Sequence, residues 1–133
     1  ATITGNNNAN NLNGTATDDL IIGLGGNDIL NGLGGNDILN GLGGNDTLRG
    51  GAGNDTIDGG IGIDLIDFSD ATGGINFTLK QSSSNTIVNL SAVGLGTDTY
   101  KNIEGVIGTN FNDTLIGSSL NDVLQGGGGN DIL

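Results

Sequence analysis

The stretch Gly50-Gly51-Ala52-Gly53-Asn54-Asp55-Thr56-Ile57-Asp58 is one copy of a nine-residue pattern that fills most of this chain. Six turn-forming residues, close to Gly-Gly-x-Gly-Asn-Asp, precede three residues of which the middle one is aliphatic. The aspartate returns at nine-residue intervals in two blocks, as Asp19, Asp28, Asp37, Asp46, Asp55, Asp64, Asp113, Asp122 and Asp131. Identical carboxylates at fixed spacing within glycine indicate a row of hard-cation sites rather than a catalytic centre.

The nine positions of the pattern, counted from its opening glycine, have distinct roles. Position four is usually glycine, and position five is usually Asn, a residue that tolerates left-handed backbone. Position eight is aliphatic, for example Leu30, Leu39, Leu48 and Ile57. Three strand residues with one inward aliphatic cannot fold alone, but stacked copies pair their backbones and continue an apolar ladder. Two copies would make one coil of a β-solenoid, with a short parallel sheet on each side.

The composition indicates that the chain needs an added stabiliser. It has 133 residues, of which 28 are Gly, and no Trp, Met, Cys or Pro. Glycine loses much backbone entropy on folding and buries no side chain, and the net charge of −12 opposes compaction. The three bases cannot form a nucleic-acid-binding patch, and no apolar run is long enough to span a bilayer. The lack of cysteine excludes disulfides and thiolate metal sites.

The expected stacking creates gaps that suit calcium. Repeats two apart in sequence would lie directly above one another, so their aspartates and turn carbonyls would surround a gap between coils. Calcium takes about six to eight oxygen ligands and accepts backbone carbonyls, whereas magnesium prefers a tighter octahedron and keeps its waters. We therefore expect calcium as the cofactor, and the net charge of −12 matches about six divalent ions.

The pattern resembles the RTX (repeats-in-toxin) family of haemolysin-type calcium-binding nonapeptide repeats. The resemblance covers Gly14 to Asp67 and Glu104 to Leu133. It implies a right-handed parallel β-roll with calcium between successive turns, bound by the aspartates and by alternating turn carbonyls. The implied metal ligands are the nine aspartates and the turn glycines Gly23, Gly25, Gly32, Gly34, Gly41, Gly43, Gly50 and Gly59. The implied aspartate pairs sharing an ion are Asp19/Asp37, Asp28/Asp46, Asp37/Asp55, Asp46/Asp64 and Asp113/Asp131.

Several repeats depart from the pattern. Position two holds leucine in three repeats, at Leu24, Leu33 and Leu42, which would alter the approach of one carbonyl. Thr17, Phe111 and Leu120 replace the position-four glycine, which leaves the form of those turns open. Asn10 replaces the first aspartate and suggests a cap with a weak or absent site. Glu104 holds the acidic position at the start of the second block, and whether its longer side chain binds metal stays open.

The nine-residue phase is lost in the middle of the chain. We expect one continuous domain made of a first roll block, an inserted region that packs on the roll or continues it, and a second roll block, at 1–67, 68–101 and 102–133. Two alternating apolar segments, 74–80 and 86–90, are joined by a polar segment and predict an inserted β-hairpin.

Residues of the interruption have two readings. The structural one is that the hairpin covers a face of the roll, and the minor alternative is a ligand site at Phe77 or Tyr100. Asp70 and Asp98 lie at the two junctions and are candidates to complete irregular calcium sites.

Positions seven and nine should face outward, yet many are aliphatic: Leu20, Ile22, Ile29, Ile38, Leu65, Ile107, Ile116, Val123 and Ile132. Scattered surface apolars are normal, but stacking would join these into columns, and long columns usually meet a partner. With the open strand edges at the ends of a solenoid, they predict a homo-oligomer or filament as an alternative to a monomer.

The functional expectation is a structural module rather than an enzyme. The chain has no His, and carboxylate pairs made by a repeat share one environment, which does not separate an acid from a base. We expect a calcium-binding structural module of a secreted bacterial protein, extracellular or at the cell surface, that folds on binding extracellular Ca²⁺. The resemblance implies type I secretion. The alternatives are a self-assembling extracellular subunit (filament, surface layer or matrix) and an adhesin module.

Overall fold

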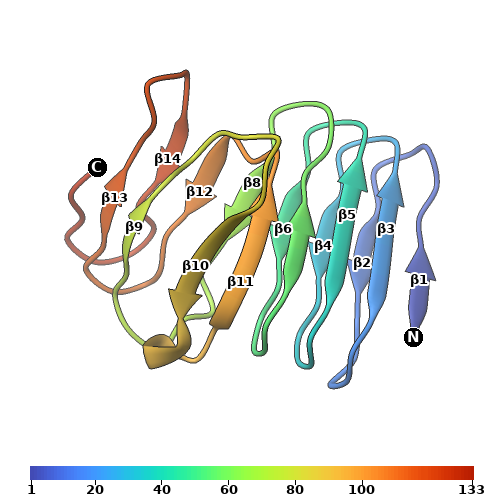
Figure 1. Ribbon diagram of the computed structural model, residues 1–133, viewed down its shortest axis with the longest axis horizontal. Coiled ribbons are helices and arrows are strands. Elements are labelled where there is room, and N and C mark those ends of the chain that lie inside the picture. The colour runs from blue at the N-terminus through green and yellow to red at the C-terminus, as the bar shows by residue number, and fades with distance from the viewer.

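Most repeats contribute one short strand to one of two mainly parallel sheets in the computed structural model, which describes all of residues 1–133 (Figure 1). The first sheet contains, in order, β1 (Thr2–Thr4), β3 (Leu20–Leu24), β5 (Ile38–Leu42), β7 (Thr56–Asp58), β11 (Gly96–Lys101) and β10 (Thr86–Leu90). The second contains β14 (Val123–Gln125), β12 (Gly105–Ile107), β8 (Leu65–Asp67), β6 (Thr47–Arg49), β4 (Ile29–Asn31) and β2 (Asn11–Asn13). A separate pair joins β13 (Thr114–Ile116) to β9 (Asn76–Thr78). The predicted all-β, parallel β-solenoid is confirmed.

The two sheets enclose one apolar ladder made by the position-eight side chains. In the first sheet the ladder residues in register are Ile21, Leu39, Ile57 and Tyr100, and in the second they are Leu30, Leu48, Ile66 and Val106. All eight are at most 1% exposed. Burial of such a side chain contributes about 1.5–3 kcal/mol, but each repeat supplies only one. The core therefore forms only when coils stack.

The interruption enters the stack out of chain order. β9 pairs in parallel with β13, so Phe77 lies opposite Leu115 as a rung of the ladder. β10 pairs antiparallel with β11 at the edge of the first sheet. An inserted hairpin is present, but the prediction that 74–80 pairs with 86–90 is wrong. The segment around Phe77 has an inward side chain at the right spacing, and it joins a coil instead of its sequence neighbour.

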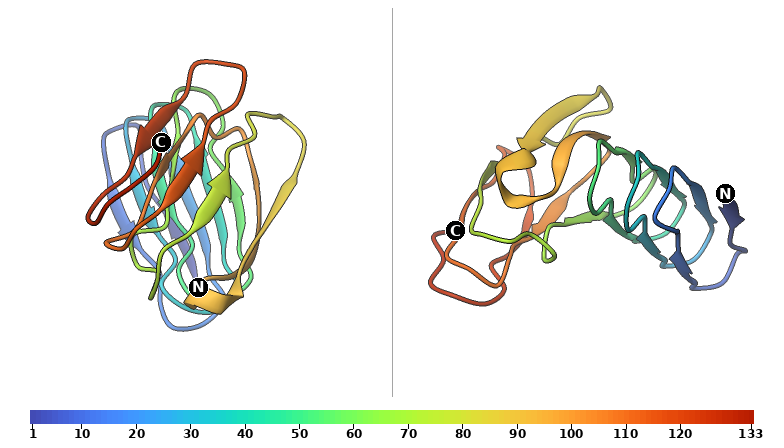
Figure 2. Two further views of the ribbon diagram at one scale, coloured as in Figure 1. Left: turned by 90° about the vertical axis from the view of Figure 1, so that its left-hand side faces the viewer. Right: turned by 90° about the horizontal axis from the view of Figure 1, so that it is seen from below.

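β10 and the 3₁₀ turn η1 (Ser91–Val93) lie on the outside of the stack (Figure 2). The side chains of Ile87 and Val88 alternate between exposed and half-buried, as expected for a strand with one covered face. Gly94 closes the turn in the left-handed region, at φ 84°, and leads the chain back into β11. The hairpin thus returns the chain to the roll, beside β7.

An aromatic cluster fills the core where the interruption joins the roll. The rings of Phe68 and Phe77 meet edge to face with centroids 5.1 Å apart, and those of Phe77 and Tyr100 are 5.8 Å apart. All three are at most 3% exposed, and the Tyr100 hydroxyl accepts a hydrogen bond from the Lys80 N–H. These contacts place Phe77 and Tyr100 in the core, in agreement with the structural reading.

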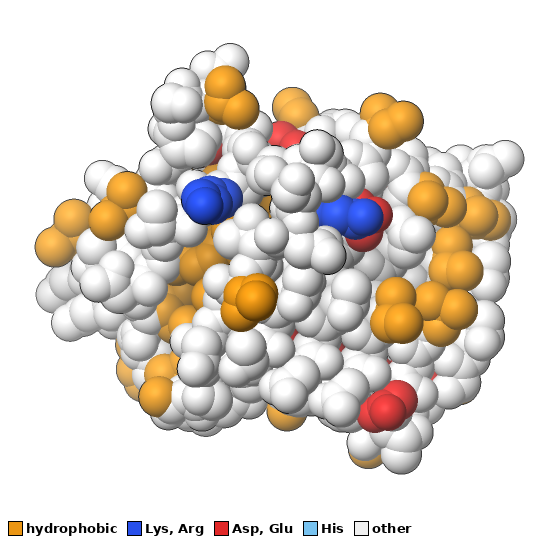
Figure 3. Space-filling model, viewed as in Figure 1, with side chains coloured by type: hydrophobic (Ala, Val, Ile, Leu, Met, Phe, Trp, Pro, Cys, Tyr) orange, Lys and Arg blue, Asp and Glu red, His pale blue; other side chains and the backbone are white.

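The outer apolar columns are short. Leu20 lies beside Ile38 as predicted, but Thr56 follows in the same column. Ile29 and Leu65 share a column on the second sheet with Thr47 between them. Figure 3 shows an apolar group over β3 and β5 and few acidic atoms on the same face. Self-association through these columns stays a prediction. The structure contains no helix with the length and hydrophobicity needed to cross a membrane.

Candidate metal centre

The aspartates form two ladders, one along each side of the roll. In each ladder the backbone N–H of one aspartate donates to the Oδ1 atom of the aspartate 18 residues further on. Asp19, Asp37 and Asp55 are linked in this way on one side, at 2.8 and 2.9 Å. Asp28, Asp46 and Asp64 form the second series, at 2.8 Å. One oxygen of each carboxylate therefore ties two coils together.

The other carboxylate oxygen is buried and unsatisfied in five of these residues. The Oδ2 atoms concerned have no hydrogen-bond partner and belong to Asp28, Asp37, Asp46, Asp55 and Asp64. All five residues are at most 2% exposed. A desolvated carboxylate oxygen without a donor costs several kcal/mol unless a cation compensates it. The orphaned oxygens therefore mark places where the chain requires a positive partner.

Position-one glycines make room around these oxygens. A Cβ atom built on Gly32 would clash with Asp37 Oδ2 and with the carbonyl oxygen of Gly50 in the next coil. The same relation holds for Gly23 with Asp28 Oδ2 and the Gly41 carbonyl. A carboxylate oxygen and a carbonyl of the adjacent layer thus lie on one side of each glycine. This oxygen-only donor set fits calcium.

The leucines at position two adopt the same left-handed conformation as the glycines that hold this position in the next two repeats. Leu24, Leu33 and Leu42 have φ values of 78°, 76° and 70°, close to the 92° and 90° of Gly51 and Gly60. A leucine in the left-handed region costs about 1–2 kcal/mol. The turn therefore keeps its shape at these positions despite strain, and the leucines do not displace the aspartates.

The position-five asparagines build a second ladder on the outside of the turns. Asn54 N–H donates to Asn36 Oδ1 at 2.8 Å, and Asn45 N–H donates to Asn27 Oδ1 at 2.8 Å. None of these residues has positive φ, so a left-handed conformation is not the reason for asparagine here. The amide oxygen instead accepts the N–H of the coil above. Asparagine at this position therefore supports the stack through its side chain.

Burial raises the pKa of the inner carboxylates. Desolvation raises the pKa of Asp55 and Asp64 to about 7, and the neighbouring Asp37 and Asp46 carboxylates add to this rise. The pKa values of Asp37 and Asp46 are raised for the same first reason. Such shifts report that the charged forms lack compensation within the protein.

One residue of the interruption and one at the start of the second block continue the ladders. Asp98 Oδ1 accepts the Asp55 N–H at 2.8 Å, and Glu104 Oε2 accepts the Asp64 N–H at 2.9 Å. Only Asn102 to Glu104 separate β11 from β12, so the longer glutamate side chain spans the shortened turn. Desolvation raises the pKa of Asp98 to about 7. Asp70 is exposed and takes no place in either ladder.

Asp98 has the role of a repeat aspartate, although the spacing hides it. The segment Asp98-Thr99-Tyr100-Lys101 parallels Asp55-Thr56-Ile57-Asp58, with an aromatic residue at position eight. The separation of 43 positions between the two aspartates is not a multiple of nine. Its position at the junction made it a candidate, and the local pattern is the sequence signal for its place in the ladder.

Three predicted site aspartates are satisfied inside their own turns. Thr15 N–H donates to Asp19 Oδ2 at 2.6 Å, and Ser118 N–H donates to Asp122 Oδ2 at 2.6 Å. Asp113 Oδ2 accepts a bond from its own turn as well, at 2.7 Å. Asp131 lies partly exposed in the last turn, and its Oδ1 accepts the Asp113 N–H at 2.9 Å.

The predicted glycine carbonyls fall into two groups. Position-one carbonyls of the coil above approach the carboxylates, namely those of Gly32, Gly41, Gly50 and Gly59, while that of Gly23 approaches Asn10 of the first turn across Gly5. Position-three glycines use their N–H groups to bind the coil below, as Gly25, Gly34 and Gly43 do toward the carbonyls of Asn6, Thr15 and Leu24. No group of three acidic side chains is placed so that all three could hold one metal ion. The gaps between coils therefore offer carboxylate oxygens together with backbone carbonyl oxygens.

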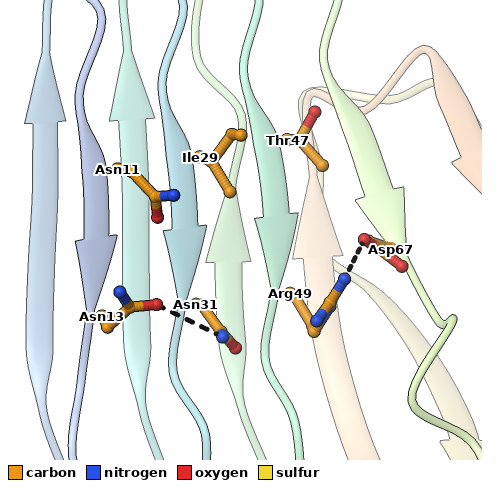
Figure 4. A pocket seen from close by; sticks show the side chains of 7 residues that line it. All are labelled: Asn11, Asn13, Ile29, Asn31, Thr47, Arg49 and Asp67. Atoms are coloured by element: carbon orange, nitrogen blue, oxygen red, sulfur yellow. Dashed lines mark hydrogen bonds and ion pairs between the residues drawn. The ribbon is translucent and has the colours of Figure 1, made fainter.

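A polar hollow of about 220 Å³ lies outside the second sheet (Figure 4). It is lined by position-nine residues in register, Asn13, Asn31, Arg49 and Asp67. Arg49 Nη2 pairs with Asp67 Oδ2 at 2.8 Å, so the only carboxylate there already has a cation. The hollow is therefore not a calcium site.

Comparison with known proteins agrees with the geometry of the gaps. The family model for the RTX calcium-binding nonapeptide repeat, four copies, matches residues 4–39, 32–66 and 107–133. No curated protein matches the chain significantly. RTX repeats bind Ca²⁺ and are structural, non-catalytic modules, and proteins that carry them are typically extracellular. The chain belongs to the family of RTX calcium-binding nonapeptide repeats and is a calcium-binding repeat module.

Proposed function

We propose that this chain is a module of a secreted bacterial protein that folds when it meets extracellular calcium. The observation that carries the proposal is the set of buried Oδ2 atoms without partners, on Asp28, Asp37, Asp46, Asp55 and Asp64. A metal-free roll must hold these oxygens out of water with no donor. Binding of Ca²⁺ therefore contributes directly to the free energy of folding.

The charge of the chain supports the same coupling. The net charge of −12 is carried by 15 acids, and most of the repeat aspartates lie inside the roll. Three bases and the N-terminal amine are the only protein cations, and the amine and two of the bases already pair with Asp19, Asp67 and Asp58. The inner carboxylates are left to ions from solution. Extracellular calcium modules work at about 10⁻⁴–10⁻³ M, so calcium would be scarce for folding inside the cell and sufficient outside.

Far-UV circular dichroism of the chain, titrated with Ca²⁺ and then with EDTA, tests the proposal. We expect a coil spectrum without calcium, a β spectrum at millimolar calcium, and reversal by EDTA. Magnesium at the same concentration is the matched control and should leave the coil spectrum in place. A chain with β structure in EDTA and no response to calcium would contradict calcium-coupled folding. Sedimentation of the same samples reports whether the folded chain is a monomer.

A further inference from the structure

The turns of this roll have two forms, which differ in how the aspartate is held. In the turn 14–19, Asp19 Oδ2 accepts bonds from the Thr15 N–H at 2.6 Å and from the Thr15 hydroxyl at 3.0 Å. The N–H of Thr17 in turn donates to the Thr15 hydroxyl oxygen at 3.2 Å. The threonine at position two thus donates two hydrogen bonds to the carboxylate of the same turn. We name this form the closed turn.

The closed turn recurs in the second block. Thr109 donates its N–H to Asp113 Oδ2 at 2.7 Å and its hydroxyl to Asp113 Oδ1 at 2.8 Å. Ser118 does the same for Asp122, with distances of 2.6 and 2.8 Å. In both turns the N–H of the position-four residue donates to that hydroxyl oxygen, at 3.0 and 3.1 Å.

The first turn reaches the same arrangement with an amide. Asn6 N–H donates to Asn10 Oδ1 at 2.8 Å, and Asn8 N–H donates to Asn6 Oδ1 at 2.8 Å. Every turn that lacks glycine at position four therefore has a polar side chain at position two. The position-four residues of these turns are Asn8, Thr17, Phe111 and Leu120. The two sequence departures are linked because the position-two side chain accepts the position-four N–H.

The five other turns of the first block are open. Their position-two residues, Leu24, Leu33, Leu42, Gly51 and Gly60, have positive φ, and so do the position-four glycines that follow. The position-two N–H does not reach the carboxylate, and Oδ2 of the turn is buried without a partner in each case, on Asp28, Asp37, Asp46, Asp55 and Asp64. An open turn thus presents an uncompensated oxygen to the coil above it, whereas a closed turn presents none.

We propose that the position-two side chain decides which turns of this chain take calcium, and that calcium enters only the gaps above open turns. These gaps lie between the aspartate of an open turn and the acidic residue of the coil above, at Asp28/Asp46, Asp37/Asp55, Asp46/Asp64, Asp55/Asp98 and Asp64/Glu104. The inference rests on the proposed calcium binding and adds its selectivity.

The assignment changes the ion pairs that the sequence suggested. The pairs Asp19/Asp37 and Asp113/Asp131 lose their ions, because the Thr15 and Thr109 donors already occupy the lower carboxylate. Asp98 and Glu104 gain a role as ligands of the upper layer. The turn of Asp131 is open in form, with Gly127 and Gly129 in the left-handed region, and a gap above it would need a following coil. Within the described coils the assignment gives five ions, one for each orphaned oxygen.

The test exchanges a closed and an open turn and counts bound calcium. The closing variant copies residues 15–18 onto 33–36 through Leu33→Thr, Gly34→Ala, Gly35→Thr and Asn36→Asp. We expect the count, measured by equilibrium dialysis with ⁴⁵Ca²⁺ and by calorimetry, to fall by one. The opening variant makes the reverse exchange, Thr15→Leu, Ala16→Gly, Thr17→Gly and Asp18→Asn, and should raise the count by one. The matched control copies one open turn onto another, Leu33→Gly with Gly34→Ala, and should leave the count unchanged.

Two carboxamide variants cover the case in which an exchanged turn does not fold. Asp37→Asn removes an oxygen that the assignment gives to calcium, and it should lower the count. Asp122→Asn removes a carboxylate that Ser118 satisfies, and it should leave the count unchanged. The inference would be overturned if both variants lost the same number of calcium ions, or if neither turn exchange changed the number of bound ions. A wild-type chain that binds no calcium would instead refute the proposed function itself, so the two failures are distinguishable.

Discussion

The backbone N–H of Asp55 donates to Oδ1 of Asp98 at 2.8 Å across 43 residues of sequence. The same bond joins Asp37 N–H to Asp55 Oδ1 across 18 residues. The roll therefore resumes its register after a long excursion, and Asp98 takes the place that the next repeat aspartate would have held. The chain between them is accommodated outside the ladder and, through β9, further along the stack.

Two substitutions of Asp98 should separate the contribution of its hydrogen bond to stability from the contribution of its charge to calcium binding. Asp98→Ala leaves the buried Asp55 N–H without an acceptor, which costs about 1–3 kcal/mol. Asp98→Asn keeps an acceptor oxygen and removes the charge, so the stability of the metal-free chain should hold while calcium affinity falls. Urea unfolding with and without calcium measures both effects. Equal behaviour of the two variants would contradict a role for the Asp98 charge in binding.

Two glycines of one turn should respond differently to the same change. Gly32→Ala puts a methyl group into Asp37 Oδ2 and the Gly50 carbonyl, and overpacking of this kind costs about 1–3 kcal/mol. The methyl group of Gly34→Ala lies 3.6 Å from its nearest neighbours in Ala16, an ordinary contact. Calcium titration followed by circular dichroism should show a weakened Gly32→Ala variant and a near-normal Gly34→Ala control. Similar losses in both would show that glycine acts here through flexibility alone.

The stability of the metal-free roll should fall as the pH rises, whereas its affinity for calcium should increase. Burial raises the pKa of Asp55, Asp64 and Asp98 to about 7, well above the unfolded value of about 3.9. Below about pH 4 both states hold these protons, and the raised pKa values cost nothing. Between about pH 4 and pH 7 the unfolded chain releases these protons while the folded chain retains them, so the metal-free roll becomes less stable as the pH rises. Calcium displaces those protons, so its affinity should rise over the same range, by up to about tenfold per pH unit for each proton displaced.

Calcium titrations at about pH 5.5 and about pH 7.5 measure the change in calcium affinity. Urea unfolding in calcium-free buffer at the same pH values measures the change in stability of the metal-free roll. Asp19 is an internal reference, because the N-terminal ammonium and Thr15 lower its pKa. An affinity that does not change between these pH values would contradict proton displacement from the inner carboxylates.

The aromatic junction should contribute to stability without contributing to the calcium count. Tyr100→Phe removes the hydroxyl that accepts the Lys80 N–H, which costs about 1 kcal/mol. Phe77→Ala empties a core position packed against Phe68 and Tyr100, which costs about 3–5 kcal/mol. Thermal unfolding in saturating calcium measures both changes. A lower number of bound ions in the folded Tyr100→Phe variant would show that the junction also shapes a metal site.

The repeat was readable from the sequence because each of its positions has one physical task. The aliphatic at position eight, as in Leu39 and Leu48, has no other place to be buried than the space between the sheets. The aspartate at position six, with glycine at position one, is brought to the same place in every coil. Periodicity therefore predicted the solenoid and its register, and it placed the carboxylates that we propose as metal ligands in the turns.

The interruption could not be read in the same way, because its partners are distant in sequence. The alternation around Phe77 predicts a strand, but only the exposed coil at β13 determines that β9 pairs there instead of with β10. The sequence marked Asp98 as a candidate at the junction but could not identify its partner, since Asp55 lies outside any local spacing. Long-range pairing depends on which edges remain open after the regular coils have stacked.

The sequence by itself determined that this protein is a row of stacked turns with inward carboxylates, since nine-residue spacing leaves the backbone no other way to bury its aliphatics. The tertiary structure decided which carboxylate oxygens find a donor within the protein. Asp19 and Asp37 occupy identical positions in the repeat, but the Thr15 hydroxyl and N–H reach the first, and no donor reaches Oδ2 of the second. That difference arises from hydrogen-bond geometry inside a folded turn, which spacing alone does not specify.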